Sequence, residues 1–318
     1  MAVSVLDQLK EHTVVVADTG NFDSIMQYEP RDATTNPSLI LKASKQEEYS
    51  SLVEQVVKSA KSNGINDVDQ VMDHLLVEFG LSILKVVPGR VSTEVDARLS
   101  FDYDASLEKA RSIISLYEEN GVSRDRILIK LATTWEGVEV SKVLEQEDIH
   151  TNMTLLFSLV QAVACAEAGS QLISPFVGRI LDWHREEYGK EFEGIDDPGV
   201  QSVIQIFNYY KKFGHPTEVM GASFRNTGEI KELVGCDLLT IGPKFLEEMQ
   251  NDFSSIDVKL NEQMAKDSPI EKLEVTEPSF RFLLNEDAMA TEKLAEGIRK
   301  FSADVRTLEE LLKNLISA

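Results

Sequence analysis

The sequence predicts a (β/α)8 TIM barrel with extra N-terminal and C-terminal helices. Eight short apolar or β-branched runs recur along the chain, and amphipathic segments with helical spacing separate them. Strands that alternate with helices form a parallel sheet, and eight repeats favour closure into a barrel over an open sheet. The 318 residues exceed the roughly 250 that a barrel typically needs, so we expect one domain over residues 1–318. No GxGxxG follows the first run, which disfavours dinucleotide binding.

The expected elements follow one another in a regular order. The eight strands are expected at Val14–Asp18, Ala33–Asn36, Val91–Val95, Ile127–Ala132, Asn152–Phe157, Leu172–Phe176, Val219–Phe224 and Leu238–Ile241. The additions to the barrel are a short first helix, two helices between the second and third strands, an exposed acidic loop and a helical tail, at Val3–His12, Ser44–Pro88, Gly189–Gly199 and Pro278–Ala318. Within the tail, two helices are expected, at Ala288–Phe301 and Asp304–Ile316.

The charge of the chain restricts its partners. A formal net charge of −22 argues against nucleic acid and anionic membranes, because no basic field offsets phosphate repulsion. An anionic substrate would therefore need a few arginines placed locally against this field. No apolar run is long enough to cross a bilayer and no secretory signal is expected, so we expect a cytoplasmic protein without a membrane partner. Cys165 and Cys236 belong to no CxxC pair and are expected to be reduced and buried.

Lys130 lies in the middle of an expected strand, among apolar neighbours. Ammonium groups are rarely buried without a partner, and loss of water favours the neutral amine, a nucleophile toward carbonyls. The alternative is a lysine that forms an ion pair or extends its head group to water, and this segment alone does not separate the two. Asp18, at the end of the first strand, is placed either for acid–base catalysis or for capping the following loop.

Polar residues alternate along the third strand. The spacing of Ser92, Glu94 and Asp96 predicts that all three share one face. Three polar groups in a barrel interior would be costly without partners, so Glu94 is a candidate for proton transfer. Asp96 and Arg98 are expected to form a supporting ion pair. The alternative is that this face is a solvated rim.

Two asparagines and two threonines lie on polar faces of the second and fifth expected strands. Thr34 and Asn36 share a face near the end of the second strand, although Asn36 before Pro37 is also an ordinary way to leave a strand. Asn152 and Thr154 share the polar face of the fifth strand. The Thr154 hydroxyl is a candidate for relaying a proton or positioning water, with a structural hydrogen bond as the alternative.

Two later strand-to-helix segments each carry a serine and an arginine, Ser174 with Arg179 and Ser223 with Arg225. Two guanidinium forks with hydroxyl groups are suited to bind a phosphate, and phosphate sites in barrels are frequent in the late loops. The alternative is two surface salt bridges, which the small neighbouring residues disfavour. The five histidines have no ligand spacing such as HExxH, so no metal site is expected.

Taken together, these segments make the sequence resemble transaldolase. The resemblance spans nearly the whole chain, and six motifs in order with compatible spacing are highly specific. Thr133 stands where the family usually has serine, a conservative change outside the proposed chemistry. The motifs are VVVADTG at 14–20, DATTNPSLI at 32–40, VPGRVSTEVDARLS at 87–100, RILIKLATTWEG at 126–137, SPFVGRILDW at 174–183 and MGASFRN at 220–226.

The resemblance implies a cofactor-free, homodimeric enzyme that acts on sugar phosphates. It would transfer a dihydroxyacetone unit from sedoheptulose 7-phosphate to glyceraldehyde 3-phosphate through a Schiff base on Lys130, with Asp18 as the acid–base group. Glu94 and Thr154 would hold a catalytic water. Two rivals stay open: a class I aldolase that releases the three-carbon fragment, and a sugar-phosphate-binding barrel without catalysis. The residues implied to contact substrate are Asn36, Asn152, Ser174, Phe176, Arg179, Ser223 and Arg225.

Overall fold

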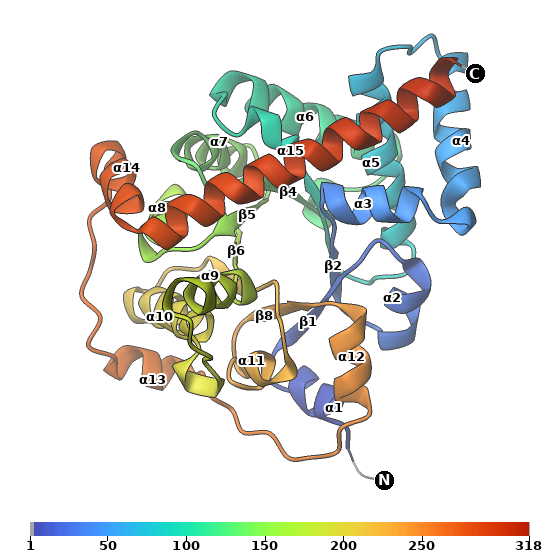
Figure 1. Ribbon diagram of the computed structural model, residues 1–318. Coiled ribbons are helices and arrows are strands. Elements are labelled where there is room, and N and C mark those ends of the chain that lie inside the picture. The colour runs from blue at the N-terminus through green and yellow to red at the C-terminus, as the bar shows by residue number, and fades with distance from the viewer. Residues whose placement is uncertain (1–2, 318) are drawn as a thin grey trace.

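The chain folds around a closed barrel of eight parallel strands, which confirms the predicted fold class (Figure 1). The structure is a computed structural model that describes residues 3–317, without the side chains of residues 23 and 24. Each strand pairs with its neighbours in sequence order, and the last strand pairs with the first. The strands are β1 (Val14–Asp18), β2 (Asp32–Thr34), β3 (Val91–Glu94), β4 (Ile127–Ala132), β5 (Thr151–Leu156), β6 (Leu172–Pro175), β7 (Glu218–Gly221) and β8 (Leu238–Ile241).

Helices connect the strands and cover the outside of the barrel. A short helix precedes β1, and two long helices fill the insert after β2, as the sequence predicts. The helices are α1 (Val5–Lys10), α2 (Phe22–Tyr28), α3 (Pro37–Ser44), α4 (Glu47–Ser62), α5 (Val68–Leu84), α6 (Tyr103–Glu119), α7 (Trp135–Gln146), α8 (Leu159–Ala168), α9 (Gly178–Tyr188), α10 (Pro198–Phe213), α11 (Thr227–Lys231), α12 (Pro243–Gln250), α13 (Glu262–Asp267), α14 (Glu277–Glu286) and α15 (Ala288–Ser317), with a 3-10 helix at Ala97–Leu99.

Successive side chains of each strand point alternately outward to the helices and inward to the barrel axis. Outward-facing apolar residues such as Val15, Ile129 and Ile173 are buried in the main core between the strands and the surrounding helices. Burial of one such side chain contributes roughly 1.5–3 kcal/mol relative to exposure. The inward-facing positions instead form layers along the barrel axis. The middle layer is apolar, and its buried residues are Val16, Leu128, Leu172, Met220 and Leu238.

Five strands end earlier than the sequence predicts, and the second and seventh fall short by the most. The second strand stops before Asn36 because this residue caps α3, where its Oδ1 accepts a hydrogen bond from Leu39 N (2.9 Å) and Pro37 occupies the first turn. The seventh strand ends at Gly221, because the backbone of Ser223 turns into the left-handed region at φ 62°. Both departures occur at the end of the strand that faces the predicted site.

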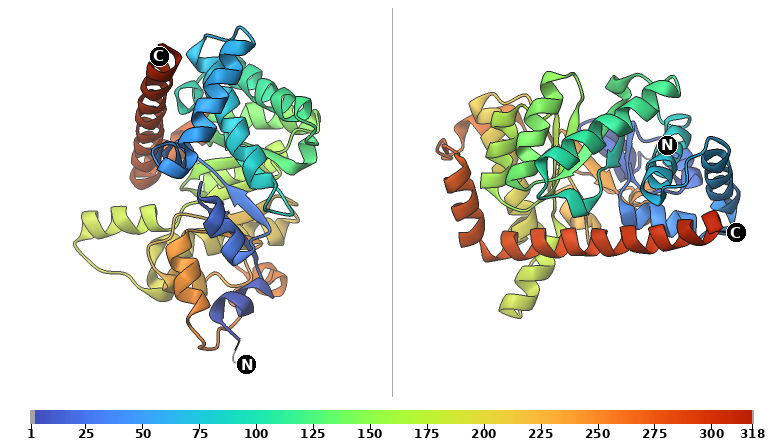
Figure 2. Two further views of the ribbon diagram at one scale, coloured as in Figure 1. Left: turned by 90° about the vertical axis from the view of Figure 1, so that its right-hand side faces the viewer. Right: turned by 90° about the horizontal axis from the view of Figure 1, so that it is seen from above.

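The tail differs from the prediction of two helices. It forms one continuous helix of 30 residues, α15, after the separate α14. Figures 1 and 2 show this long helix running straight along one side of the barrel, from α14 to the helical insert. It packs against β5 and α9 with one part of its length and against α3, α4 and α5 with another.

The acidic segment Gly189–Gly199 is not exposed throughout. Asp197 within it is buried, and its carboxylate caps α10 by accepting a hydrogen bond from Gly199 N (2.7 Å). Cys165 and Cys236 are buried and unbridged, in agreement with the prediction. Among residues 3–317, no helix combines the length and the hydrophobicity that crossing a bilayer requires.

Candidate active site

A cavity of about 70 Å³ lies at the carboxyl ends of the strands. This end of a barrel is where active sites form, because residues from several strands converge there. Three of the eleven predicted site residues do not line the cavity but contact residues that do. Glu94 contacts Lys130, Asn152 contacts Ser174 and Arg225 contacts Ser223. The other eight predicted site residues line the cavity directly: Asp18, Asn36, Lys130, Thr154, Ser174, Phe176, Arg179 and Ser223.

Lys130 reaches the cavity from the interior face of β4. Its Nζ donates a hydrogen bond to the carbonyl of Thr35 (3.1 Å) and lies 3.2 Å from Glu94 Oε2. The lysine side chain is only 7% exposed. The lysine is therefore both buried and paired with a carboxylate, which confirms the ion pair of the alternative interpretation, and its role as a nucleophile stays a prediction. Glu94 is close enough to accept a proton from the ammonium group, which would leave a neutral amine in the cavity.

Two buried oxygen atoms near this lysine have no hydrogen-bond partner among the described residues. They are Glu94 Oε2, whose contact with Lys130 lacks hydrogen-bond geometry, and Thr154 Oγ1. Burial raises the pKa of Glu94 above its ordinary value, and the Lys130 ammonium opposes this effect. Buried polar atoms normally have partners, so such a pair marks a place for a water or a substrate hydroxyl.

The third strand is shorter than predicted, so its alternation of inward and outward side chains does not extend to Asp96. It ends at Glu94, and Asp96 instead caps the 3-10 helix that follows. Asp96 forms the predicted ion pair with Arg98 outside the cavity, so this ion pair does not contact the reacting groups. Ser92 and Glu94 share the inward face and are buried, as expected.

Asp18 stands at the end of β1 and lines the same cavity. Thr34 Oγ1 donates a hydrogen bond to Asp18 Oδ1 (3.2 Å) and also hydrogen-bonds to Thr240 Oγ1 (3.0 Å). Burial raises the pKa of Asp18, while the Lys130 ammonium and the Thr34 hydroxyl act in the opposite direction. Because burial favours the neutral form of this carboxyl, Asp18 is suited both to accept a proton and to return it, as a general acid–base group does.

The two predicted asparagines occupy different positions. Asn36 lines the cavity with its Oδ1 engaged in the helix cap, so its amide nitrogen is the group it can offer a ligand. Asn152 is fully buried behind the wall, where its Nδ2 donates to Ser92 Oγ (2.9 Å) and its Oδ1 accepts from Ser174 Oγ (2.5 Å). Asn152 therefore holds Ser174 in place, and Ser174 is the residue that faces the cavity.

Arg179 brings a buried positive charge to the cavity from the first turn of α9. Its Cζ lies 4.9 Å from the ring centroid of Phe176, and its Nη1 is buried without a hydrogen-bond partner among the described residues. Burial lowers the pKa of Arg179, and the nearby Arg225 cation adds to this effect. Guanidinium remains charged under ordinary conditions, so an unpaired one in a cavity is a site for an anion.

Arg225 and Ser223 approach Arg179 from the loop after β7. Arg225 Nη1 lies 3.4 Å from Ser223 Oγ, and its Nη2 forms an ion pair with Asp182 (2.7 Å). Gly178 permits the close approach, because a Cβ there would lie 2.6 Å from Arg225 Cγ. The left-handed Ser223 backbone is of the strained type often found at ligand sites.

A buried carboxyl pair supports this loop from beneath, and the sequence gives no sign of it. Glu229 Oε2 accepts a hydrogen bond from the backbone N–H of Arg225 (2.6 Å). Burial, together with the nearby Asp197 carboxyl, raises the pKa of Glu229 to about 7. Two acidic groups so close together favour retention of a proton by the pair.

Four more residues that line the cavity were missed from the sequence: Met220, Ala222, Thr240 and Phe301. Thr240 had a detectable signal, since it is a polar residue inside an apolar strand, as Lys130 is. Phe301 had only a weak one: it ends the segment EGIRKF at 296–301, to which the resemblance extends, and its helical spacing shows only that it is buried.

Comparison with known proteins agrees with this geometry. Residues 15–312 match the profile of a family described as Transaldolase/Fructose-6-phosphate aldolase. Two solved structures are similar over part of their length, with a TM-score of 0.34 each, too low to support any argument. One is described as a glycerophosphoryl diester phosphodiesterase from Silicibacter pomeroyi (14% identity, 57% of this chain and 58% of that one), and the other is a mandelate oxidase variant (15% identity, 60% and 58%).

The match to the solved structures thus spans less than two thirds of either solved chain. The family match covers nearly all of the described barrel, including the strands that carry Asp18, Glu94, Lys130 and Thr154. On this basis the chain belongs to the transaldolase/fructose-6-phosphate aldolase family.

Proposed function

We propose that the chain is a transaldolase that moves a dihydroxyacetone unit from sedoheptulose 7-phosphate to glyceraldehyde 3-phosphate, giving erythrose 4-phosphate and fructose 6-phosphate. The observation that carries the proposal is the arrangement around Lys130. Its amine lies 3.2 Å from Glu94, in a cavity that Asp18 and Arg179 also line. A buried amine, an acid–base carboxyl and an anion site meet there within reach of one sugar phosphate.

The reaction begins with the amine of Lys130. Glu94 takes a proton from the ammonium group, and the neutral amine attacks the C2 carbonyl carbon of the ketose. The carbonyl oxygen takes one proton from the attacking nitrogen and one from Glu94 and leaves as water, which gives an iminium ion. The unpartnered oxygen atoms of Glu94 and Thr154 are suited to hold this water and to return it when the imine is hydrolysed.

Cleavage of the C3–C4 bond follows. Asp18 removes the proton from the C4 hydroxyl, and the electrons of the C3–C4 bond move to the iminium ion, which acts as an electron sink. An aldose phosphate departs and the three-carbon enamine stays on Lys130. The acceptor aldehyde then forms the new bond, Asp18 returns the proton to the new hydroxyl, and hydrolysis frees the product ketose.

Two arginines supply the local positive charge that an anionic substrate needs in a chain with a net charge of −22. Arg179 and Arg225 face each other across the loops after β6 and β7, and Ser223 lies beside them. Arg179, which has no ion pair among the described residues, would be the main cation that holds a phosphate group against the unfavourable overall field, and Arg225, paired with Asp182, would add to it. Binding energy from the remote phosphate then orients the reacting bond over Lys130 and Asp18.

Chemical trapping tests the nucleophile. Incubation with fructose 6-phosphate and borohydride reduces the imine, so mass spectrometry of peptides should find a three-carbon adduct on Lys130. An adduct on another lysine, or no adduct at all, would overturn the assignment.

Dependence on an acceptor separates the two reactions that the family name includes. A transaldolase supplied with fructose 6-phosphate forms sedoheptulose 7-phosphate only when erythrose 4-phosphate is present. Release of free dihydroxyacetone at the same rate without erythrose 4-phosphate would identify an aldolase instead. A protein that binds sugar phosphates without catalysis would give neither product.

The resemblance also supports proposals about the state of the protein. We expect a single-domain homodimer in the cytoplasm that needs no cofactor or metal and binds no nucleic acid. Light scattering coupled to gel filtration measures the molar mass, and a value near that of one 35.6 kDa chain would contradict the dimer.

A further inference from the structure

The tail helix α15 is attached to the loops that surround the cavity. Trp183 Nε1 in α9 donates to Glu292 Oε2 (2.7 Å), and Ser38 in α3 donates to Asp304. These bonds join the helix to segments that follow β6 and β2. Figure 1 and the right-hand view of Figure 2 show how the helix spans the distance between these segments.

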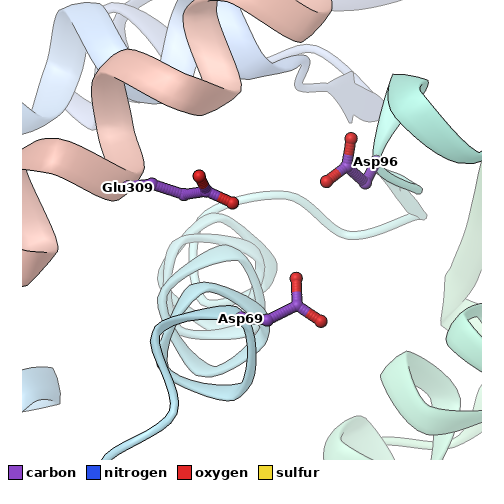
Figure 3. Close-up of side chains that lie close together, drawn as sticks. All are labelled: Asp69, Asp96 and Glu309. Atoms are coloured by element: carbon purple, nitrogen blue, oxygen red, sulfur yellow. The ribbon is translucent and has the colours of Figure 1, made fainter.

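A third attachment involves the carboxylates of Asp69, Asp96 and Glu309 (Figure 3). Their cluster could be mistaken for a cation site, but positively charged side chains offset it. Arg98 Nη2 forms ion pairs with both Asp96 and Glu309, and Lys109 Nζ lies 2.8 Å from Asp69. The cluster therefore links α15 to the 3-10 helix after β3, and it makes no case for a metal.

Between these attachments, α15 comes unusually close to the barrel. A Cβ on Gly297 would lie 2.6 Å from Leu155 Cδ2 and 3.4 Å from Arg179 Nη1. Glycine is therefore required at this contact unless the helix or Leu155 moves. Phe301 lies four residues later, on the same face of the helix and one turn along it.

This close approach brings the ring of Phe301 into the cavity wall. The side chain is 3% exposed, and the Cζ atom of Arg179 lies 5.6 Å from its ring centroid. The same Cζ is 4.9 Å from the ring of Phe176. Both distances are within the roughly 6 Å over which a guanidinium group is attracted to an aromatic ring.

An aromatic partner affects Arg179 differently from an acidic one. A carboxylate would neutralise the guanidinium and repel an incoming phosphate, whereas a ring attracts the cation and carries no net charge. Within residues 3–317, no carboxylate forms an ion pair with Arg179. The acid of α15 closest in sequence to Gly297, Glu296, is instead paired with Lys293 (2.8 Å) and Lys300.

We propose that Phe301 is a positioning residue for substrate phosphate, because its ring holds the Arg179 guanidinium in the cavity with its charge available. This inference rests on the proposed function, since it assumes a phosphorylated ketose as the substrate. It assigns the tail helix a part in phosphate binding that the barrel strands alone do not provide.

The first test compares two ketones in the borohydride trapping reaction. In Phe301→Leu, the concentration of fructose 6-phosphate that gives half-maximal labelling of Lys130 should rise roughly three- to tenfold, the range expected for loss of a cation–π contact. Labelling by dihydroxyacetone, which has no phosphate, should be unchanged. Phe280→Leu is the matched control, because Phe280 is equally buried but lies on α14 against Trp135.

A second test keeps the shape of the ring and so avoids any effect on folding. Phenylalanines with increasing numbers of fluorine atoms, incorporated at position 301, have progressively less negative charge on the ring face. Half-maximal labelling by fructose 6-phosphate should require higher concentrations with each added fluorine. Equal effects on both ketones in the first test, or no dependence on fluorine in the second, would overturn the inference. Absence of labelling in the unaltered protein would instead refute the proposed function.

Discussion

Both ends of the barrel bury charged groups but use them differently. At the amino ends of the strands, Asp32 is buried between Arg31 and Arg90, and Arg90 also reaches Glu218 at the start of β7 (2.8 Å). At the carboxyl ends, buried oxygen and nitrogen atoms of Glu94, Thr154 and Arg179 lack hydrogen-bond partners among the residues that the structure describes. We call the amino end the closed end, because its charged groups pair with one another in a network of Arg31, Asp32, Arg90 and Glu218. We call the carboxyl end the open end, because these atoms of Glu94, Thr154 and Arg179 are unpartnered among the described residues.

The closed end is a structural unit. Burial acts to raise the pKa of Asp32, but hydrogen bonds from Arg31 and Arg90 outweigh it and hold the pKa below its ordinary value. Glu145 joins neighbouring strands in the same region by accepting hydrogen bonds from Thr151 N and Gln171 N (2.8 Å each). Satisfied networks of this kind make the arrangement of the strands rigid.

The open end has the opposite character. Its polar atoms are buried without partners in the described part of the chain, which costs stability unless a water or a ligand completes their bonding. The comparison shows that burial of charge alone does not mark the active site of this barrel. At the site, burial of charge coincides with unsatisfied bonding capacity and with a cavity, whereas unpartnered buried atoms without this cavity also occur elsewhere among the described residues, as at Thr217 and Glu136.

Loss of the nucleophile should have the largest effect. In Lys130→Met, we expect kcat/KM to fall on the order of 10⁴-fold or more, because none of the other described residues that line the cavity carries an amine. The fold should be retained, since methionine fills a similar volume. A coupled assay with fructose 6-phosphate and erythrose 4-phosphate measures the loss, and Lys142→Met on the surface of α7 is the control.

Glu94→Gln comes next and tests whether the open end is catalytic. Glutamine has the same shape but accepts no proton, so kcat should fall roughly 10²- to 10⁴-fold. The KM for fructose 6-phosphate should change little, because the phosphate site is separate from Glu94. Glu139→Gln, at a half-buried position of α7 that does not line the cavity, should leave both constants unchanged. If Glu94→Gln altered only KM, Glu94 would be a binding group.

Arg90→Met tests the closed end, where the effect should fall on stability alone. Its removal takes away one of the two cations of the buried Asp32 carboxylate, and breaking a buried ion pair typically costs about 3–5 kcal/mol. Urea unfolding measures this loss in the free energy of unfolding. The KM and kcat of the folded protein should stay the same, and a fall in kcat comparable to that of Glu94→Gln would remove the distinction between the two ends.

The same contrast explains how far the sequence alone could lead. The strands, and the inward polarity of Lys130 and Thr154, follow from a period of two residues, and the structure brings all eleven predicted residues to one end of the barrel or next to it. Periodicity does not show that Asn152 lies behind Ser174, because this depends on packing depth. It also could not place Phe301, whose position depends on contacts of α15 with segments distant in sequence.

The smallest predicted effect concerns the carboxyl pair beneath the phosphate loop. The pKa of Glu229 is raised from 4.5 to about 7 by burial, so the folded protein holds a proton that the unfolded chain has already lost in this range. The stability contributed by this proton is complete below about pH 4.5 and is lost as the pH rises through about 7. Glu229→Gln cannot release a proton, so its melting temperature should fall less than that of the unaltered protein between pH 5 and pH 7. Identical slopes in the two proteins would show that the open end of the barrel does not depend on protonation of Glu229.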